Sequence, residues 1–286
     1  MISILIPTDF SKNSMNAITY ALEFFKYQTA EFYFMHAYQN ELQDHDALVS
    51  RTVFDDILDG VRSQSQINLK SLLHTVEKMT PNPRFTYHTI SAYNSLVEEV
   101  NYIVESKNID LIVMGTKGKA NVKNTDFGSQ TFQVLNHVKC PVLAIPSNYT
   151  NPQPKHILLP SDYSMFYKPR ELKILCDLAT PYHSVIDVLY VSKKSKLSTR
   201  QANIQAYLKN TISKTEVNFP LSPGIRIAET IQNYIKGHAI DLLVMVNTRH
   251  TFLENMLFPS TLDKVSFNLT IPLLAMQNTA RPTPNH

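Results

Sequence analysis

Glycine is scarce in this chain of 286 residues, with 6 copies where ordinary usage would give about 20. Glycine reaches positive φ and permits close backbone approach, so the positions of these few are informative. The chain has only two cysteines, Cys140 and Cys176, with no CxxC pair and no zinc-type histidine spacing. Their scarcity excludes a disulfide framework and a zinc site, and it indicates a reducing, cytoplasmic setting with both thiols buried as small apolar groups.

An excess of one charge and long apolar runs are also missing. The 27 Lys+Arg against 24 Asp+Glu leave a net charge of +3, which argues against a nucleic-acid partner held by phosphate neutralisation. No apolar run approaches the ~20 residues that span a bilayer. The opening MISILIPTDF lacks the basic region and cleavage site of a signal peptide and predicts a first strand instead. We expect a soluble cytoplasmic protein that neither binds nucleic acid nor enters a membrane.

The chain contains an internal repeat. Four blocks recur in order: ILIPTDFS as ILLPSDYS, DLIVM as DLLVM, FGS as FPS, and PVLA as PLLA. The first pair is offset by 153 residues and the other three by 131, so the second copy is about 22 residues shorter (153 − 131) in its middle. We expect domains at 1–147 and 156–278, joined by a polar, proline-bearing linker at 148–155 and followed by a disordered tail at 279–286.

Within each copy, short buried strands alternate with amphipathic helices. A strand at 2–6 comes first, and Ser11 is predicted to cap the helix that follows it. The stretch 44–79 is predicted to be helical with a break near Gly60, and the sequence leaves open one helix, two helices or a mobile lid. The alternation predicts right-handed crossovers and two tandem doubly wound parallel α/β sheets of Rossmann-like type. Ligands of such sheets bind beyond the carboxyl ends of the strands.

Three of the six glycines lie in one loop between a predicted strand and a predicted helix, at Gly115, Gly118 and Gly128. We expect Gly115 to let the chain turn, Gly118 to leave room for a ligand, and Gly128 to uncover the N–H groups of the next helix as an anion site. Ser129 adds a hydroxyl, and three lysines add positive charge: Lys117, Lys119 and Lys123. A phosphate-bearing ligand fits this loop, whereas the alternative is a connection that needs glycine only for turning. The loop matches neither the Walker A motif nor the dinucleotide fingerprint.

The spacing G-x2-G-x9-G-S, placed between DLIVMG and CPVLAIP, resembles the ATP-binding signature of universal stress proteins. The opening ILIPTDFS and the segment FMHA at 34–37 extend the resemblance over nearly all of the first copy and, more weakly, over the second. It implies an adenine nucleotide alpha hydrolase-like fold and an ATP site, with or without Mg²⁺. The implied adenosine contacts are Pro7, Thr8, Asp9 as an acceptor, and the backbone of Ala37. The implied ribose and phosphate contacts are Met114, Gly115, Gly118, Gly128, Ser129 and Gln130.

The second copy departs from this pattern. Val246, Arg249 and Pro259 stand where the three glycines of the loop would be, and only the serine is kept, as Ser260. Added bulk and a missing N–H predict that this half does not bind ATP in the same way. It is expected to be a structural half, although Asp162 and Ser260 leave a different small ligand open.

The resemblance also implies that the last strands pair antiparallel. Val142–Ile145 and Leu273–Met276 would then form an intramolecular pseudo-dimer, with a further homodimer left open. We expect an ATP-binding stress-response regulator, with the nucleotide in the first domain. The alternatives are a weak ATPase and a scaffold that has lost its ligand. No catalytic residue is assigned, because the chain has no GxSxG elbow or HExxH pair and no Lys plus carboxylate-bound Mg²⁺ set.

Several single residues have two interpretations. Asp9 can accept from a ligand or cap the following helix beside Ser11. His36, at the end of a predicted strand, is interpreted as a packed histidine and not as a catalyst. The run Asp44-His45-Asp46 is interpreted as a solvated loop, because adjacent side chains rarely converge on one ion. No metal site is predicted.

Overall fold

The computed structural model describes residues 1–42, 51–118, 127–192, 196–224, 226–247 and 269–277. The chain divides into two compact units, Met1–Thr150 and Asn151–His286. The division falls inside the segment predicted as a linker, and each end of that segment is bonded to its own unit. Asn16 Nδ2 donates to the Tyr149 carbonyl at 3.2 Å, and the backbone N–H of Lys155 donates to Asp241 Oδ2 at 2.8 Å. The domain limits at 1–147 and 156–278 stay predictions, and the tail at 279–286 lies outside the described residues.

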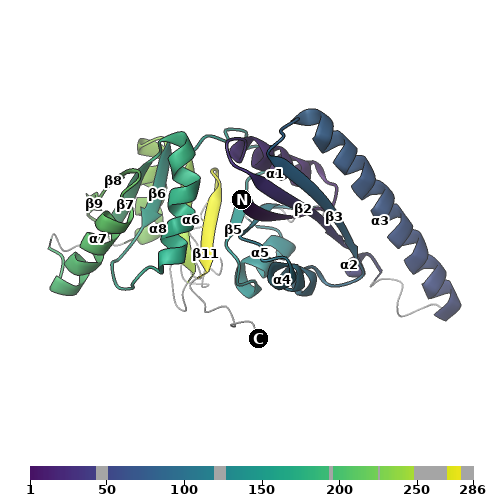
Figure 1. Cartoon of the computed structure of the whole chain (residues 1–286). Coiled ribbons are helices and arrows are strands. Elements are labelled where there is room, and N and C mark those ends of the chain that lie inside the picture. Colours follow the sequence, from purple (N-terminus) through teal and green to yellow (C-terminus); the bar gives the residue numbers. More distant parts are fainter. Residues whose placement is uncertain (43–50, 119–126, 193–195, 225, 248–268, 278–286) are drawn as a thin grey trace, which may run out of the picture. The chain divides into compact units, whose positions relative to one another are not determined.

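The first unit is a parallel sheet with helices on both faces (Figure 1). Its strand order is β3-β2-β1-β4-β5. The strands are β1 Ile2–Pro7, β2 Ala30–Ala37, β3 Phe85–Ala92, β4 Leu111–Gly115 and β5 Val142–Ile145. The helices are α1 Lys12–Phe24, α2 Gln39–Leu42, α3 Arg51–Met79, α4 Leu96–Ser106 and α5 Ser129–His137. Strands β2 and β3 are added on one side of β1, and β4 and β5 on the other. The order in which strands are added therefore reverses between β1 and β4, which makes this the topological switch point of the sheet.

The core of this unit follows from its apolar strands. Ile4, Leu5 and Ile6 of β1 are fully buried, as a strand covered on both faces requires. Ser11 caps α1 as predicted, because its side chain accepts from the backbone N–H of Ser14 at 3.2 Å. Aromatic rings from α1, β2 and β3 pack between the sheet and its helices: Phe25, Phe32, Phe34, Phe85 and Tyr87.

Helix α3 corrects the prediction of a break near Gly60. It runs without interruption from Arg51 to Met79, through the glycine. One glycine inside a helix costs only about 1 kcal/mol relative to alanine. The packed face of the C-terminal half, with Leu69, Leu72 and Val76 buried, stabilises the helix against β2 and β3. Residues 44–50, which the prediction included, lie outside the described part of the chain.

The second unit repeats this architecture with a shorter middle. Its strand order is β11-β10-β6-β7-β8, with β9 also paired to β7. Its strands are β6 His156–Pro160, β7 Val185–Val191, β8 Glu216–Asn218, β9 Leu221–Ser222, β10 Leu242–Asn247 and β11 Leu273–Gln277. Its helices are α6 Pro169–Ala179, the short η1 Thr180–Tyr182, α7 Thr199–Thr211 and α8 Ile227–Gly237. Helix α7 has 13 residues where α3 has 29, which accounts for most of the difference in length between the copies.

The repeat is also visible in the backbone. Phe10 and Tyr163, 153 residues apart, both have positive φ, at 60° and 53°. Asn108 and Ala239, 131 residues apart, do so as well, at 50° and 48°. None of the six glycines has a positive φ, and all six are described. Larger residues therefore occupy the left-handed turns in this chain, although those turns are easier for glycine.

The recurring DL motif joins two strands in each unit. Asp110 Oδ2 accepts from the backbone N–H of Ser3 at 3.0 Å, and the Asp110 N–H donates to the Ser3 carbonyl at 2.8 Å. Asp241 makes the same two bonds with His156, at 3.0 and 2.8 Å. The two aspartates thus fix the start of β4 to β1 and of β10 to β6. The predicted pairing of β5 with β11 concerns how the two units sit together, and it stays a prediction. Among the described helices, none is both long and apolar enough to cross a membrane.

Candidate functional site

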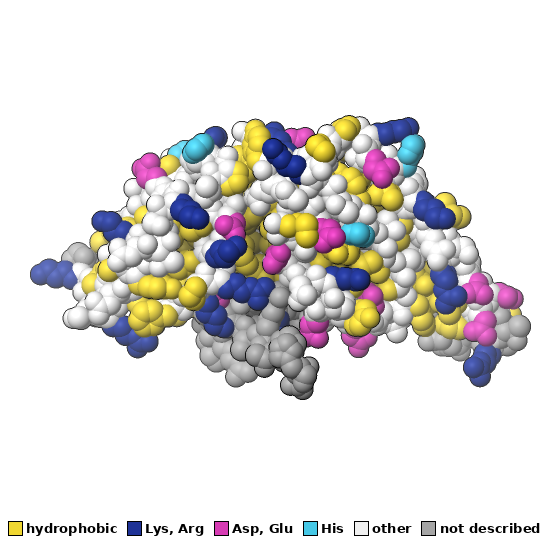
Figure 2. All heavy atoms as spheres, viewed as in Figure 1, with side chains coloured by type: hydrophobic (Ala, Val, Ile, Leu, Met, Phe, Trp, Pro, Cys, Tyr) yellow, Lys and Arg dark blue, Asp and Glu magenta, His cyan; other side chains and the backbone are white. Residues whose placement is uncertain are grey.

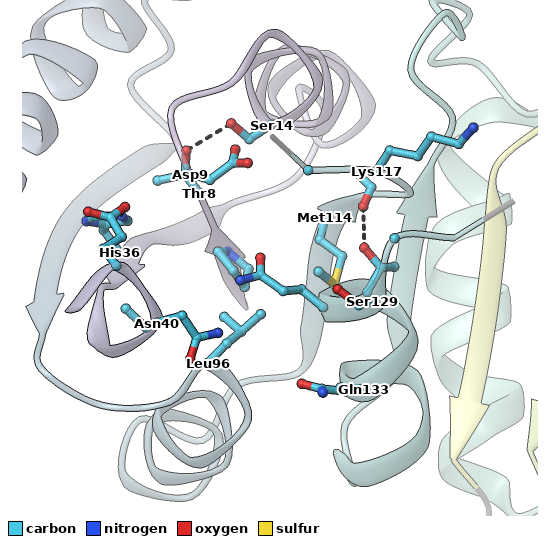
Figure 3. A pocket seen from close by; sticks show the side chains of 18 residues that line it. Thr8, Asp9, Ser14, His36, Asn40, Leu96, Met114, Lys117, Ser129 and Gln133 are labelled. Atoms are coloured by element: carbon cyan, nitrogen blue, oxygen red, sulfur yellow. Dashed lines mark hydrogen bonds and ion pairs between the residues drawn. The ribbon is translucent and has the colours of Figure 1, made fainter. Parts of the chain in front are cut away.

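A pocket of about 380 Å³ lies at the carboxyl ends of the first unit's strands (Figure 3). It forms where β1 and β4 separate. These strands pair only at Ile4–Leu111 and Leu5–Ile112, so the residues beyond them can diverge. This is the topological switch point of the sheet, which is where ligands of doubly wound sheets bind.

All ten residues predicted to contact a nucleotide line this one pocket. They are Pro7, Thr8, Asp9, Ala37, Met114, Gly115, Gly118, Gly128, Ser129 and Gln130. The structure therefore brings together side chains and backbone from β1, β2, β4 and the start of α5. Their contact with a ligand stays a prediction.

Eight further residues line the pocket. They are Ser14, His36, Asn40, Glu41, Leu96, Lys117, Thr131 and Gln133. Lys117 had been singled out only for its charge, and His36 only as a packed residue. Most of the others lie in the first turn or two of a helix that follows a strand end. The sequence could have indicated these residues, because the residues just after parallel strands gather at one edge of the sheet.

The β1–α1 corner supplies acceptors to the pocket. Asp9 Oδ1 accepts from the backbone N–H of Ser11 at 3.0 Å, which closes the turn before α1, whereas the cap of the helix is Ser11 itself. Asp9 also lines the pocket, and its contact with a ligand stays a prediction. Thr8 Oγ1 donates to Ser14 Oγ at 3.1 Å and accepts from the Phe10 N–H at 3.0 Å. The corner is therefore ordered by its own hydrogen bonds.

None of the three loop glycines has a positive φ, and two of them, Gly115 and Gly118, leave room for a close contact. A Cβ on Gly115 would lie 3.1 Å from the backbone oxygen of Asn13, so this glycine allows the end of β4 to approach α1. Because φ of Gly115 is not positive, its conformation does not require glycine, and its expected role in turning the chain stays a prediction. A Cβ on Gly118 would lie 3.1 Å from Asp9 Oδ2, at the pocket wall. A Cβ on Gly128 would make only ordinary contacts, the nearest at 3.5 Å.

The start of α5 supplies donors. Gly128 is the N-cap and has no side chain to bond the first-turn N–H groups. Its own N–H donates to the Thr116 carbonyl at 2.7 Å, which closes the neck of the loop. Thr131 Oγ1, which is buried, donates to the Gly115 carbonyl at 2.8 Å. The uncapped helix start favours an anion at this end of the pocket, and Lys117 lines the same wall. Lys119 and Lys123 lie outside the described residues.

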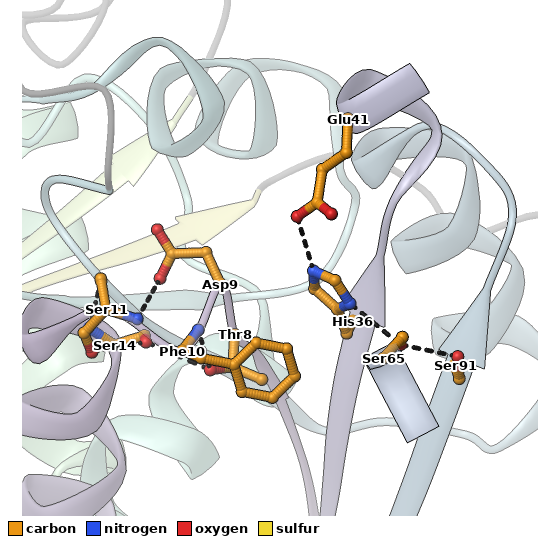
Figure 4. A network of polar contacts seen from close by, with 9 residues as sticks. All are labelled: Thr8, Asp9, Phe10, Ser11, Ser14, His36, Glu41, Ser65 and Ser91. Carbon is orange, nitrogen blue, oxygen red and sulfur yellow. Dashed lines mark hydrogen bonds and ion pairs between the residues drawn. The ribbon is translucent and has the colours of Figure 1, made fainter. Parts of the chain in front are cut away.

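A chain of polar groups runs from the opposite wall into α3 and β3 (Figure 4). Glu41 Oε1 and His36 Nε2 are 3.2 Å apart, and His36 Nδ1 and Ser65 Oγ are 3.0 Å apart. Ser65 Oγ and Ser91 Oγ are 2.7 Å apart. His36 is only 5% exposed, so the interpretation as a packed histidine agrees with its burial and bonds. It also lines the pocket, which the sequence did not indicate.

Both acceptors and donors line the pocket. The acceptors include Asp9 after β1 and Glu41 in α2, and the donors include the N–H groups at the start of α5 after β4. Asp9 Oδ2 also lies beside Gly118 of the β4–α5 loop. A ligand with hydroxyl or amino donors and an anionic group would satisfy both kinds of group.

The second unit keeps the corner but changes its surroundings. The N–H groups of Tyr163 and Ser164 bond to Ser161 Oγ at 3.1 Å and Asp162 Oδ1 at 2.8 Å, as in the first copy. The position of Ser14 is taken by Tyr167, which is 4% exposed and whose pKa is raised by burial. Helix α6 begins at Pro169, four residues later than the offset of 153 from Lys12 would place it.

Other predicted features of the second unit can be placed only in part. Val246, which replaces Gly115, lies in β10. Arg249, Pro259 and Ser260 lie outside the described residues.

The remaining predictions concern metal ligands, cysteines and surface charge. Within the described ranges, no three His, Cys, Asp or Glu side chains are grouped as a metal site would need. The run Asp44-His45-Asp46 lies outside those ranges. Cys140 and Cys176 are both buried. On the face shown in Figure 2, basic and acidic side chains are interspersed.

Comparison with known proteins gives the family. The model of the universal stress protein family matches residues 1–146. Universal stress protein MJ0531 of Methanocaldococcus jannaschii is 30% identical over 142 residues, which cover 50% of this chain and 80% of that protein. Universal stress protein MJ0577 of the same organism is 25% identical over 151 residues, which cover 50% and 93%. The crystal structure of a universal stress protein from Archaeoglobus fulgidus covers 96% of both chains at a TM-score of 0.67 and 16% identity, and it shows the shared fold. The chain belongs to the universal stress protein family.

Proposed function

We propose that the first unit binds ATP in the pocket at the ends of β1, β2 and β4, and that the protein acts as a nucleotide-dependent regulator in a stress response. The observation that carries this proposal is the placement of all ten predicted nucleotide contacts around one pocket. Its volume of about 380 Å³ is within the range of small-molecule sites.

The polarity of the pocket supports a particular direction for the ligand. Asp9 would accept from the ribose hydroxyls, and the backbone of Ala37 would meet the base. The phosphates would lie at the uncapped start of α5, near Ser129 and Lys117, where the helix dipole favours negative charge. Mg²⁺ would accompany the phosphates without needing a protein site of its own, since magnesium is often held mainly by phosphate oxygens and water.

We propose that the second unit is a pairing half that does not bind ATP in this way. The buried Tyr167 at the position of Ser14 and Val246 at the position of Gly115 support this, because both replace a small residue of the first pocket. The proposal gives a stoichiometry of one ATP per chain. The pairing of β5 with β11 in a pseudo-dimer is part of the same proposal.

Calorimetric titration of the full chain with ATP, ADP and AMP tests the proposal. We expect one ATP site, weaker binding as phosphates are removed, and loss of binding in Gly128→Val. Gly237→Val is the matched control, because a Cβ at Gly237 meets nothing within 4 Å and this residue ends α8, in the second unit. Absence of heat with all three nucleotides in the wild type would contradict the proposal and favour a scaffold. Phosphate release over hours with bound ATP would instead identify a weak ATPase.

A further inference from the structure

We propose that Glu41 determines which base the pocket accepts, by taking a hydrogen bond from the 6-amino group of a purine. His36, Ser65 and Ser91 are proposed as positioning residues that hold the Glu41 carboxylate. This inference rests on the proposed ATP site and assigns its specificity for the base.

Glu41 lies where a base would meet it. It belongs to α2, which begins two residues after β2 ends at Ala37, and both Glu41 and Ala37 line the pocket. Its side chain is 45% exposed, so it is accessible from the pocket opening. Oε1 bonds to His36, and within the described residues no side chain bonds to Oε2. One carboxylate oxygen is therefore held by His36, and the exposure of the side chain makes the carboxylate accessible to a ligand.

The hydrogen-bond directions keep Glu41 an acceptor. A carboxylate has no proton to give, so His36 Nε2 donates to Oε1. In the neutral ring Nδ1 then accepts from the Ser65 hydroxyl, and Ser65 Oγ accepts from Ser91. If His36 is protonated, both ring nitrogens donate and the Ser65–Ser91 bond reverses. Glu41 accepts in both states.

The ring of His36 is held firmly enough to orient its partner. It is 5% exposed, and its centroid lies 4.7 Å from that of Phe10. Ser65 is 1% exposed and belongs to α3, while Ser91 belongs to β3. The Glu41 carboxylate is thus fixed by groups from three separate elements, and groups fixed in this way discriminate best between ligands.

The chemistry predicts discrimination between amino and oxo purines. Adenine presents an amino donor at C6, whereas hypoxanthine presents an oxygen acceptor there, which a carboxylate repels. Asn40 also lines the pocket, but its amide can donate or accept and can adapt to either base. Loss of one such bond, with a polar group left unpaired, changes affinity about tenfold.

The experiment measures dissociation constants of the full chain for ATP and for inosine triphosphate, whose bases differ at C6 and in the hydrogen that N1 of the 6-oxo base carries. We expect the wild type to bind ATP about tenfold tighter. In Glu41→Gln the amide can donate to the oxo group, so the ratio should fall to one or reverse. Glu41→Ala removes the acceptor without adding a donor, so its ratio should be near one. Ser65→Ala should lower the ratio while the thermal unfolding transition remains cooperative.

Glu105→Gln is the matched control. Glu105 is exposed on α4, so this substitution makes the same change of charge away from the pocket. Its ratio should equal that of the wild type. A ratio that is the same in wild type, Glu41→Gln and Glu41→Ala would overturn the inference, as would a wild type that binds ATP and inosine triphosphate equally. A wild type that binds neither nucleotide would instead overturn the proposed function.

Discussion

The Thr131 hydroxyl donates to the backbone carbonyl of Gly115 at 2.8 Å and so joins the first turn of α5 to the end of β4. Both residues line the pocket. The bond fixes the start of α5 relative to the strand ends, so the position of the proposed phosphate site depends on it.

Replacing Thr131 by valine should therefore weaken both the fold and the site. The shape of the side chain is kept, but the Gly115 carbonyl loses its buried partner, which costs about 1–3 kcal/mol. We expect a lower midpoint in urea unfolding and weaker ATP binding in calorimetry. Thr131→Ser keeps the hydroxyl and should retain most of both. Equal affinities in Thr131→Val and Thr131→Ser would contradict the role assigned to this bond.

Gly118→Ala should affect binding more than stability. The added Cβ would lie 3.1 Å from Asp9 Oδ2, a side-chain atom that can move. The displaced carboxylate would no longer accept from the ribose in the proposed pose. We expect ATP affinity to fall severalfold, with a thermal midpoint close to that of the wild type. A large loss of stability with unchanged affinity would show that this glycine serves only the fold.

Gly115→Ala and Gly60→Ala should shift stability in opposite directions. At Gly115 the new Cβ would lie 3.1 Å from a backbone oxygen of Asn13, which cannot move without shifting the start of α1. At Gly60, inside α3, a Cβ meets nothing within 4 Å, and alanine should stabilise the helix by about 0.5–1 kcal/mol. Urea unfolding of the two variants and the wild type measures both effects. A stabilised Gly115→Ala would contradict the close-approach argument.

Glu171→Gln should stabilise the second unit at neutral pH. Glu171 is 4% exposed, and burial raises the pKa of its carboxyl above the ordinary 4.5. The backbone N–H of Lys168 donates to Oε2 at 3.0 Å, but the buried Oε1 has no partner within the described structure. A carboxyl whose pKa is raised on folding contributes stability below its unfolded pKa and loses that contribution as pH rises through its folded pKa.

Glu171→Gln has no carboxyl to ionise, so it does not lose stability as the pH rises. Its thermal midpoint should exceed that of the wild type most near pH 7, and the difference should shrink as pH falls toward 4.5. Thermal unfolding of wild type and Glu171→Gln between these two pH values checks the sign. An advantage that is constant over the range would show that the carboxyl does not titrate differently in the folded chain.

Much of the fold could be predicted because its signals are local. The fully buried Ile4, Leu5 and Ile6 produce a continuous apolar run in the sequence, and Ser11 caps α1 where the sequence placed a cap. The repeat offsets also predicted equivalent corners, which the positive φ of Phe10 and Tyr163 confirms. The prediction of a break near Gly60 was wrong because the low helix preference of glycine was outweighed by packing of the later half of α3 on the sheet.

The sequence by itself determined the α/β alternation, the two copies and the glycine loop, since each rests on local composition or spacing, and the resemblance carried by that loop implied the ten residues that line one pocket. Only the tertiary structure explains why position 115 favours glycine. The Asn13 oxygen that a Cβ there would crowd lies on a helix about a hundred residues earlier in the chain. The tertiary structure also decided that Glu41, His36, Ser65 and Ser91 form one chain of hydrogen bonds across α2, β2, α3 and β3. Such contacts depend on how the crossovers bring strand ends together, which no short stretch of sequence encodes.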